Sequence, residues 1–298
     1  SSKIRRLEVK GMKSNKFKEK FGKGDSPLKI TLIYAVLIIA CICSVYPILT
    51  IVTVSLRPAD ALFTKSLSII PANATFDNFK QAFIQYDMLN WLIHSLIVSG
   101  VACIFSVMLS VTAGYAFSRF KFRGKQMGLS LLLVTQMFPL AMTLLPLYLM
   151  VIKLNMTNSY IALAVIYVST SIPFNIWMMK GFYDTIPKSL EESAFVDGAS
   201  VFRSFYQIIL PLAKPSVALT ALFSFMGAWS EYIVASVIIN DAGKLTLPVG
   251  LVSMQGQFNT AWGIYSAGAL ITAVPVMILF ICLSKYLVGG LTVGSVKG

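Results

Sequence analysis

Long apolar blocks alternate with short polar segments along the chain. Six of these blocks are long enough to cross a bilayer as helices, which takes about 20 mostly apolar residues. They cover residues 30–56, 92–117, 127–152, 159–180, 215–240 and 262–288. The block at 159–180 contains Pro173 and Asn175, which membrane helices tolerate where neighbouring helices satisfy the freed polar groups. The pattern therefore predicts an all-α integral membrane protein with six transmembrane helices.

Composition supports a membrane protein over a soluble one. Of the 298 residues, 56% are hydrophobic and 12% are charged, whereas soluble domains carry about 25% charged residues. The net charge of +13 does not indicate nucleic-acid binding, because the basic residues lie in short segments between apolar blocks rather than in one patch. The expected surroundings are therefore a lipid bilayer, and no nucleic-acid partner is expected.

The basic residues also predict the orientation of the chain. Ten of the 25 Lys and Arg residues lie in residues 1–29, which form a basic tail. Another ten lie in segments 119–125 and 180–214 and at the C-terminal end, which six spans place on the same side; five lie on the other side. An excess of Lys and Arg marks the cytoplasmic side. We therefore predict a multi-pass protein of the cell membrane with both termini in the cytoplasm.

The chain shows no residue set for catalysis or metal binding. The four cysteines, Cys41, Cys43, Cys103 and Cys282, lie in apolar stretches and form no C-x-x-C pair, so we interpret them as packing residues. His94 is the single histidine, and the phosphate-binding pattern G-x-x-x-x-G-K-[ST] is missing from the sequence. We expect no catalytic residues, no metal, no cofactor and no nucleotide site in this chain.

A long amphipathic loop, residues 181–214, is predicted on the cytoplasmic side. Ser189 followed by Glu192 fits a capping box, which predicts the start of a short helix. Gly198 breaks that helix, and a second one is expected from about Val201 until Pro211 stops it. The segment predicts a helix-turn-helix lying on the membrane face. An ordinary interfacial helix is the alternative interpretation.

The spacing in this loop is specific. Glu192-Ser193-Ala194 is followed after three residues by Gly198 and after nine more by Ile208-Ile209-Leu210-Pro211. This resembles the EAA loop of ATP-binding-cassette importer permeases, E-A-A-x3-G-x9-I-x-L-P, with Ser193 in place of the first Ala. The resemblance implies that the loop couples the permease to an ATPase. The coupling residues it implies are Glu191, Glu192, Ser193, Ala194, Gly198, Leu210 and Pro211.

The resemblance extends over almost the whole chain. Four further segments look like the smaller permease subunit of maltose/maltodextrin-type importers: Ser55–Arg57, Gly114–Arg119, Gln136–Pro139 and Gly290–Gly298. With the basic cytoplasmic tail at 1–29 set apart by its charge, the resemblance implies a transmembrane permease domain at 30–298. Within that domain it implies a type I core at about 91–288 and the coupling loop at 185–211.

The same resemblance implies partners and a substrate. The expected partners are a second homologous permease, two ATPase subunits and an extracytoplasmic solute-binding protein. The expected substrate is maltose, a maltodextrin or a related oligosaccharide, which moves by alternating access while the partner ATPases hydrolyse ATP. The alternative function is an ion-coupled secondary transporter that acts without an ATPase. That class usually carries internal repeats and several ionisable residues at membrane depth, and the predicted spans here hold a single acidic residue.

That acidic residue, Glu231, is a candidate for the translocation path together with Trp229 and Tyr232. An ionised acid at the bilayer centre costs about 2.5–3.5 kcal/mol, so it should face the protein interior or a water-filled cavity. The other interpretation places Glu231 near the outer end of its helix, where it reaches water. Trp229 and Tyr232 could stack on sugar rings, and packing or interface anchoring is equally consistent with the sequence.

Overall fold

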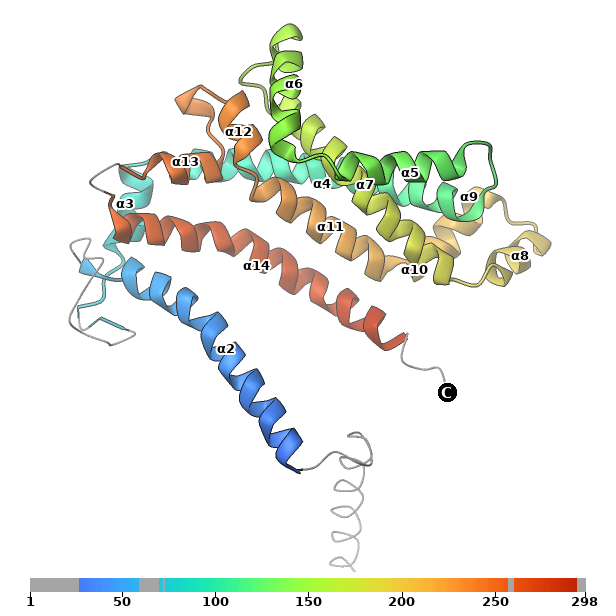
Figure 1. Ribbon diagram of the computed structural model, residues 1–298, viewed down its shortest axis with the longest axis horizontal. Coiled ribbons are helices and arrows are strands. Elements are labelled where there is room, and N and C mark those ends of the chain that lie inside the picture. Colours follow the sequence, from blue (N-terminus) through green and yellow to red (C-terminus); the bar gives the residue numbers. More distant parts are fainter. Residues whose placement is uncertain (1–26, 59–69, 72, 257–259, 294–298) are drawn as a thin grey trace, which may run out of the picture. The chain divides into compact units, whose positions relative to one another are not determined.

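The chain folds into helices, as a computed structural model describes for residues 27–58, 70–71, 73–256 and 260–293. Most of the predicted basic tail and the last five residues of the C-terminal motif lie outside these described residues. No strand occurs in the described part. The longer helices are α2 (Pro27–Ser55), α4 (Met88–Arg119), α5 (Lys125–Gln136), α6 (Leu140–Lys153), α7 (Tyr160–Thr185), α11 (Lys214–Trp229) and α14 (Trp262–Val293) (Figure 1).

Shorter helices connect them. These are α3 (Asp77–Ile84), α8 (Ser189–Val196), α9 (Val201–Ser204), α10 (Leu210–Leu212), α12 (Ile233–Ile238) and α13 (Leu247–Ser253). The chain divides into two compact units between Thr53 and Val54. The described part of the first unit lies entirely within helix α2. All the helices that follow α2 belong to the second unit.

Four helices in the described part of the chain, α2, α4, α7 and α14, are long and apolar enough to cross a membrane individually. Each coincides with a predicted span, and the all-α membrane fold is confirmed. The number rises to six when each of two bent helix pairs counts as one span. One bent pair is α5 with α6, and the other joins Val201–Leu212 to α11.

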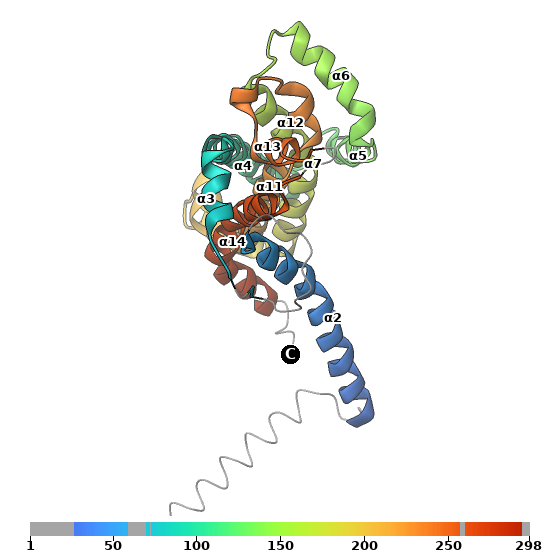
Figure 2. The same cartoon turned by 90° about the vertical axis from the view of Figure 1, so that its left-hand side faces the viewer.

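The third predicted span, 127–152, consists of two helices. The axes of α5 and α6 differ by 99°, and α6 stands away from α5 in both views (Figures 1 and 2). Pro139 precedes α6 with φ −59° and ψ 135°. A proline disfavours helical conformation in the residue before it and lacks the N–H that a continuous helix needs. The apolar block at 127–152 is long enough for one membrane helix, but it bends sharply between α5 and α6.

The predicted span at 215–240 is not one continuous helix. Helix α11 ends at Trp229, and α12 begins at Ile233. The Glu231 carboxylate between them accepts hydrogen bonds from the backbone N–H groups of Val234 (2.8 Å) and Ala235 (3.0 Å). These two groups would otherwise lack a partner in the first turn of a helix. The side chain therefore starts a new helix where apolar length alone predicts a continuation.

Small residues let α4 and α7 pack closely. Ser106 donates or accepts a 2.7 Å hydrogen bond with Ser171 of α7, and Ser110 is fully buried. At Gly114, an added Cβ would lie 2.7 Å from the Cβ of Met179. Spacings of four residues put small side chains on one helix face, where neighbouring helices can approach. This contact forms the centre of the second unit.

Helix α11 packs against both α4 and α7. Asn175, which is 1% exposed, donates from its amide to the Ser224 hydroxyl at 2.8 Å. This contact explains how the predicted span at 159–180 accommodates a polar amide. Helices α8 to α10 lie at one end of α4 and α7, and α3 and α13 lie at the other (Figure 1). The candidate coupling loop and the break after α11 are therefore separated along the bundle.

Candidate functional site

The predicted coupling loop has two helices and a turn. Helix α8 is followed by Gly198, whose φ of +82° lies in the left-handed region that favours glycine. Helix α9 then begins after Ser200, whose hydroxyl accepts a 3.2 Å hydrogen bond from the N–H of Arg203. The helix-turn-helix geometry is present. Its position on the cytoplasmic side stays a prediction.

Two details of this loop differ from the sequence prediction. Ser189 is the first residue of α8 and not its cap, because Lys188 before it already has helical angles and carries no side-chain cap bond. The capping-box prediction is therefore wrong. Pro211 also does not stop the second helix, which passes through a π-helical turn at Phe205–Ile209 and ends at Leu212. Pro211 lies in the first turn of α10, where its missing N–H is tolerated.

Helix α8 has unlike inner and outer faces. Glu191 and Ala194, three residues apart, are buried, whereas Glu192 and Ser193 are exposed. The exposed side of α8 and its continuation carry large apolar side chains, and Val196 is 88% exposed. We call this area the coupling-loop surface: Leu190, Glu192, Phe195, Val196, Val201, Phe202 and Tyr206. An apolar patch of this kind, with a charge within it, is typical of a protein-binding surface.

The buried carboxylate of Glu191 is held by α4. Its Oε1 accepts a 2.6 Å hydrogen bond from the Tyr115 hydroxyl, and its Oε2 forms an ion pair with Nε of Arg119. The Arg119 guanidinium also donates to the Ile186 carbonyl oxygen at 3.0 Å. The loop motif included Glu191, but no partner was predicted for its side chain. Arg119 and Tyr115 lie four residues apart on one helix face, and this spacing of a cation and a hydroxyl group was the signal that could have indicated the partners.

The second candidate region surrounds the break after α11. The Glu231 carboxylate accepts a 2.8 Å hydrogen bond from the Tyr167 hydroxyl in addition to its two backbone bonds. Glu231, Tyr167 and Thr170 all line two cavities, of about 400 Å³ and about 240 Å³. The geometry therefore matches the interpretation in which Glu231 faces a cavity. Its role in transport stays a prediction.

Several polar residues around these cavities had no predicted role. On α7, four of them are spaced three, one and four residues apart, from Tyr167 to Asn175, which puts them along one helix face. Ser169 lies between them in the sequence and borders the larger of the two cavities. A search for a polar stripe within an apolar span would have found them. The polar lining residues from α5 to α7 and α11 are Thr135, Gln136, Thr143, Tyr167, Ser169, Thr170, Ser171, Asn175 and Ser224.

The two aromatic candidates beside Glu231 differ from each other. Trp229 is 2% exposed, stacks on Phe225 with 5.5 Å between ring centroids, and donates its indole N–H to the Thr272 carbonyl oxygen of α14 at 3.1 Å. This geometry corresponds to the packing interpretation of Trp229. Tyr232 is 38% exposed. Stacking on a sugar ring therefore requires less rearrangement at Tyr232 than at Trp229.

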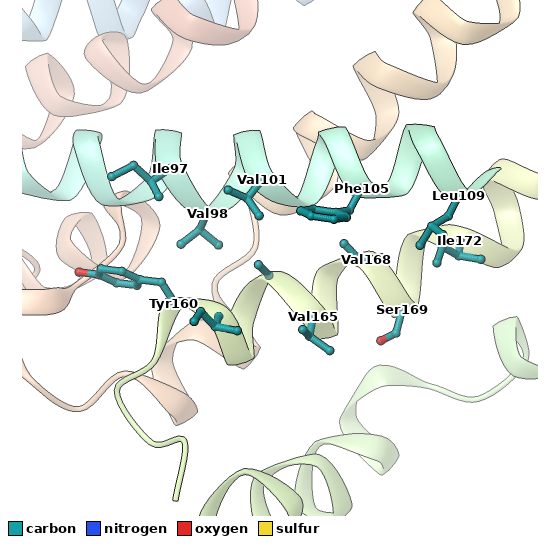
Figure 3. A pocket seen from close by; sticks show the side chains of 12 residues that line it. Ile97, Val98, Val101, Phe105, Leu109, Tyr160, Val165, Val168, Ser169 and Ile172 are labelled. Atoms are coloured by element: carbon teal, nitrogen blue, oxygen red, sulfur yellow. The ribbon is translucent and has the colours of Figure 1, made fainter. Parts of the chain in front are cut away.

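Another cavity, about 540 Å³, lies between α4 and α7. Figure 3 shows Val101 and Phe105 of α4 opposite Val168 of α7. Its other lining side chains are also apolar, apart from the hydroxyl groups of Ser169 and Tyr160. Such a lining suits acyl chains or an apolar helix, whereas a sugar needs many hydrogen-bond partners. The two cavities beside Glu231 fit a sugar better.

Comparison with known proteins decides the family. Residues 106–291 match the family model described as binding-protein-dependent transport system inner membrane component. The chain belongs to this family. The matched region includes α7, the coupling-loop surface, the break after α11 and most of α14. The chain is therefore a multi-pass membrane transport subunit.

Relatives with similar sequences agree. The chain is 37% identical over 275 residues to the galactooligosaccharides transport system permease protein GanQ of Bacillus subtilis, covering 91% of this chain and 96% of the relative. It is 38% identical over 269 residues to the maltodextrin transport system permease protein MalD of Streptococcus pneumoniae, covering 90% and 95%. These matches confirm the resemblance to carbohydrate-uptake permeases.

A solved structure supports the fold. The chain matches a subunit in the crystal structure of a bacterial ABC transporter involved in the import of the acidic polysaccharide alginate, with a TM-score of 0.77 and 22% identity. The match covers 89% of this chain and 99% of the other. It shows that the fold of that subunit extends over nearly all of this chain.

Proposed function

We propose that this permease moves an oligosaccharide of the maltose/maltodextrin type across the cell membrane by alternating access, driven by separate ATPase subunits. Its relatives are named for maltodextrins and galactooligosaccharides. The observation that carries the proposal is the coupling-loop surface, where Glu192 and large apolar side chains point away from the rest of the fold. A subunit whose sequence lacks the phosphate-binding pattern G-x-x-x-x-G-K-[ST] needs such a surface to bind an ATPase and be moved by it.

The ATPase contact centres on Glu192. A charge-assisted hydrogen bond from an ATPase side chain to this carboxylate contributes about 1.5–3 kcal/mol. Gly198 directs the chain from α8 into α9, so it sets how Glu192 and the apolar side chains around it are presented together. Because ATP is cytoplasmic, this surface lies in the cytoplasm, with both termini on the same side, in agreement with the distribution of basic residues.

The sugar passes the two cavities beside Glu231. Sugar hydroxyl groups need both donors and acceptors, and the lining residues provide hydroxyl groups, amides and one carboxylate. Polar groups placed among apolar and aromatic side chains fix the orientation of a ligand in a pocket of this kind. The complete importer contains a second homologous permease, two ATPase subunits and an extracytoplasmic solute-binding protein that delivers the sugar.

Purification and reconstitution test this function. The permease, isolated in mild detergent from its own host, should carry an ATPase chain with it. The complex in liposomes should take up radiolabelled maltotriose when ATP and the solute-binding protein are both supplied. Glu192→Lys should reach the membrane at normal levels and lose ATPase binding or uptake. Glu192→Gln is the matched variant that keeps the shape of the side chain.

A defined result would contradict the proposal. Sugar uptake driven by an ion gradient in liposomes that contain this chain without any ATPase would identify a secondary transporter. Unchanged uptake in Glu192→Lys would remove this residue from the coupling mechanism. If the complex transported another sugar but none of the maltodextrins tested, the proposed substrate would be contradicted.

A further inference from the structure

The two neighbouring glutamates of α8 face opposite ways. Glu192 is exposed on the coupling-loop surface, whereas the Glu191 side chain is 5% exposed and paired with Arg119, whose side chain is 7% exposed. A buried ion pair is a poor source of stability, because desolvating two charges offsets most of their attraction. Two apolar residues in these positions would serve packing equally well. Stability alone therefore does not explain why a charged pair occupies these two buried positions.

Arg119 makes contacts on both sides of a short connection. Helix α7 ends at Thr185 and α8 begins at Ser189, so three residues join them. The Arg119 guanidinium donates to the Ile186 carbonyl oxygen at the end of α7 and to the Glu191 carboxylate on α8. A planar guanidinium holds two acceptors in fixed directions. One side chain of α4 thus fixes the angle between α7 and α8.

Two further α4 side chains strengthen this joint. The Tyr115 hydroxyl donates to Glu191 at 2.6 Å, and the Ser118 hydroxyl donates to Asp184 of α7 at 2.6 Å. Tyr115, Ser118 and Arg119 are spaced three and four residues apart, so all three point from one face of α4. Both oxygen atoms of the Glu191 carboxylate therefore have a partner on the same helix.

We propose that Arg119 and Glu191 are positioning residues that lock α8 to α4 and α7, so that a displacement of the coupling-loop surface moves these two helices as one body. This inference rests on the proposed coupling to an ATPase. Without the pair, the connection at residues 186–188 would bend, and the motion of α8 would be lost there. Glu192 on the outer face of α8 then contacts the ATPase. Glu191 on the inner face transmits the displacement of α8 to α4 and α7.

A double variant tests transmission without a buried unpaired charge. Arg119→Met with Glu191→Gln removes both charges and keeps an oxygen acceptor for Tyr115. We expect the double variant to reach the membrane at wild-type levels, to retain bound ATPase and to hydrolyse ATP. Maltotriose uptake per ATP hydrolysed should fall about tenfold, within the usual range of coupling between sites. A pair that serves folding alone would not change this ratio.

The matched control is Lys180→Met. Lys180 forms a 2.6 Å ion pair with Asp184 four residues later on α7, and this pair does not reach α8. Uptake per ATP should be unchanged in the control. An unchanged ratio in the double variant would overturn the proposal, and so would loss of the double variant from the membrane, because the pair would then serve folding. Failure of the wild-type complex to couple ATP to uptake would instead contradict the proposed function itself.

Discussion

Glu191 and Glu231 are acidic side chains in largely apolar surroundings, and the fold accommodates them differently. Glu191 has a cation, Arg119, and a hydroxyl group within contact and is buried. Glu231 has two backbone N–H groups and the Tyr167 hydroxyl, is partly exposed, and lines two cavities. Among the described residues, no ion pair to Glu231 is present within 4.0 Å.

The different partners of the two carboxylates indicate which role each one suits. The charge of Glu191 is neutralised by a fixed partner, so it suits a rigid joint between helices. The charge of Glu231 is stabilised by dipoles, which leaves it able to attract a polar solute or a second protein group. A negative charge near the first turn of a helix is also favourable, which explains how Glu231 is tolerated at the break before α12.

The largest effect should follow from Glu191→Ala. The substitution leaves the buried Arg119 guanidinium without its carboxylate, and breaking a buried ion pair in this way costs about 3–5 kcal/mol. We expect a lower melting temperature of the purified protein in detergent and less protein in the membrane. Glu192→Ala is the control on the neighbouring exposed residue and should leave both quantities unchanged. Equal melting temperatures for the two variants would show that Glu191 is not buried in the folded protein.

Glu231→Gln should separate function from stability. The amide keeps one acceptor oxygen and the shape of the side chain, so membrane insertion and melting temperature should change little. A charge-assisted hydrogen bond to a sugar hydroxyl or a gating group contributes about 1.5–3 kcal/mol, so its loss should reduce uptake by roughly tenfold or more. Uptake and binding-protein-stimulated ATPase activity are the measurements. If both equal those of the wild type, Glu231 has a capping role alone.

Gly198→Val tests the turn that orients the coupling-loop surface. A residue with a Cβ in the left-handed region costs about 1–2 kcal/mol, and a β-branched one is the least tolerated. An added Cβ meets no other atom within 4 Å, so the strain is confined to the backbone. We expect normal membrane levels with weaker ATPase binding. Gly181→Val is the control, because Gly181 lies in helix α7 and a Cβ added there also meets no other atom within 4 Å. Equal ATPase binding in both variants would show that the turn at Gly198 does not affect ATPase binding.

Orientation determines which of the two regions can meet an ATPase. In a background without the four native cysteines, a Cys at exposed Asp241 should react with an impermeant thiol reagent added outside cells. A Cys at exposed Lys121 should react after the membrane is opened. These substitutions lie in loops, so uptake should change least of all. The reverse labelling pattern would place the coupling-loop surface outside the cell and contradict both proposals.

The sequence alone determined the parts of this protein that depend on local pattern. Apolar length identified the blocks that became α2, α4, α7 and α14, because a helix in a bilayer must satisfy its own backbone and cover it with apolar side chains. The spacing from Glu192 to Pro211 resembles the family's loop motif, and the comparisons confirm the family that it indicated. Both signals lie within segments of about 30 residues or fewer.

Tertiary structure decided which neighbour each side chain meets. The sequence could not tell that Glu191 turns inward and Glu192 outward, because that depends on Arg119, 72 residues earlier in the chain. It could not show that Glu231 takes its third hydrogen bond from Tyr167, 64 residues away. Nor could it place Trp229 against Thr272 of α14. A charge or an indole among apolar residues needs a partner, and folding alone brings that partner within hydrogen-bonding distance.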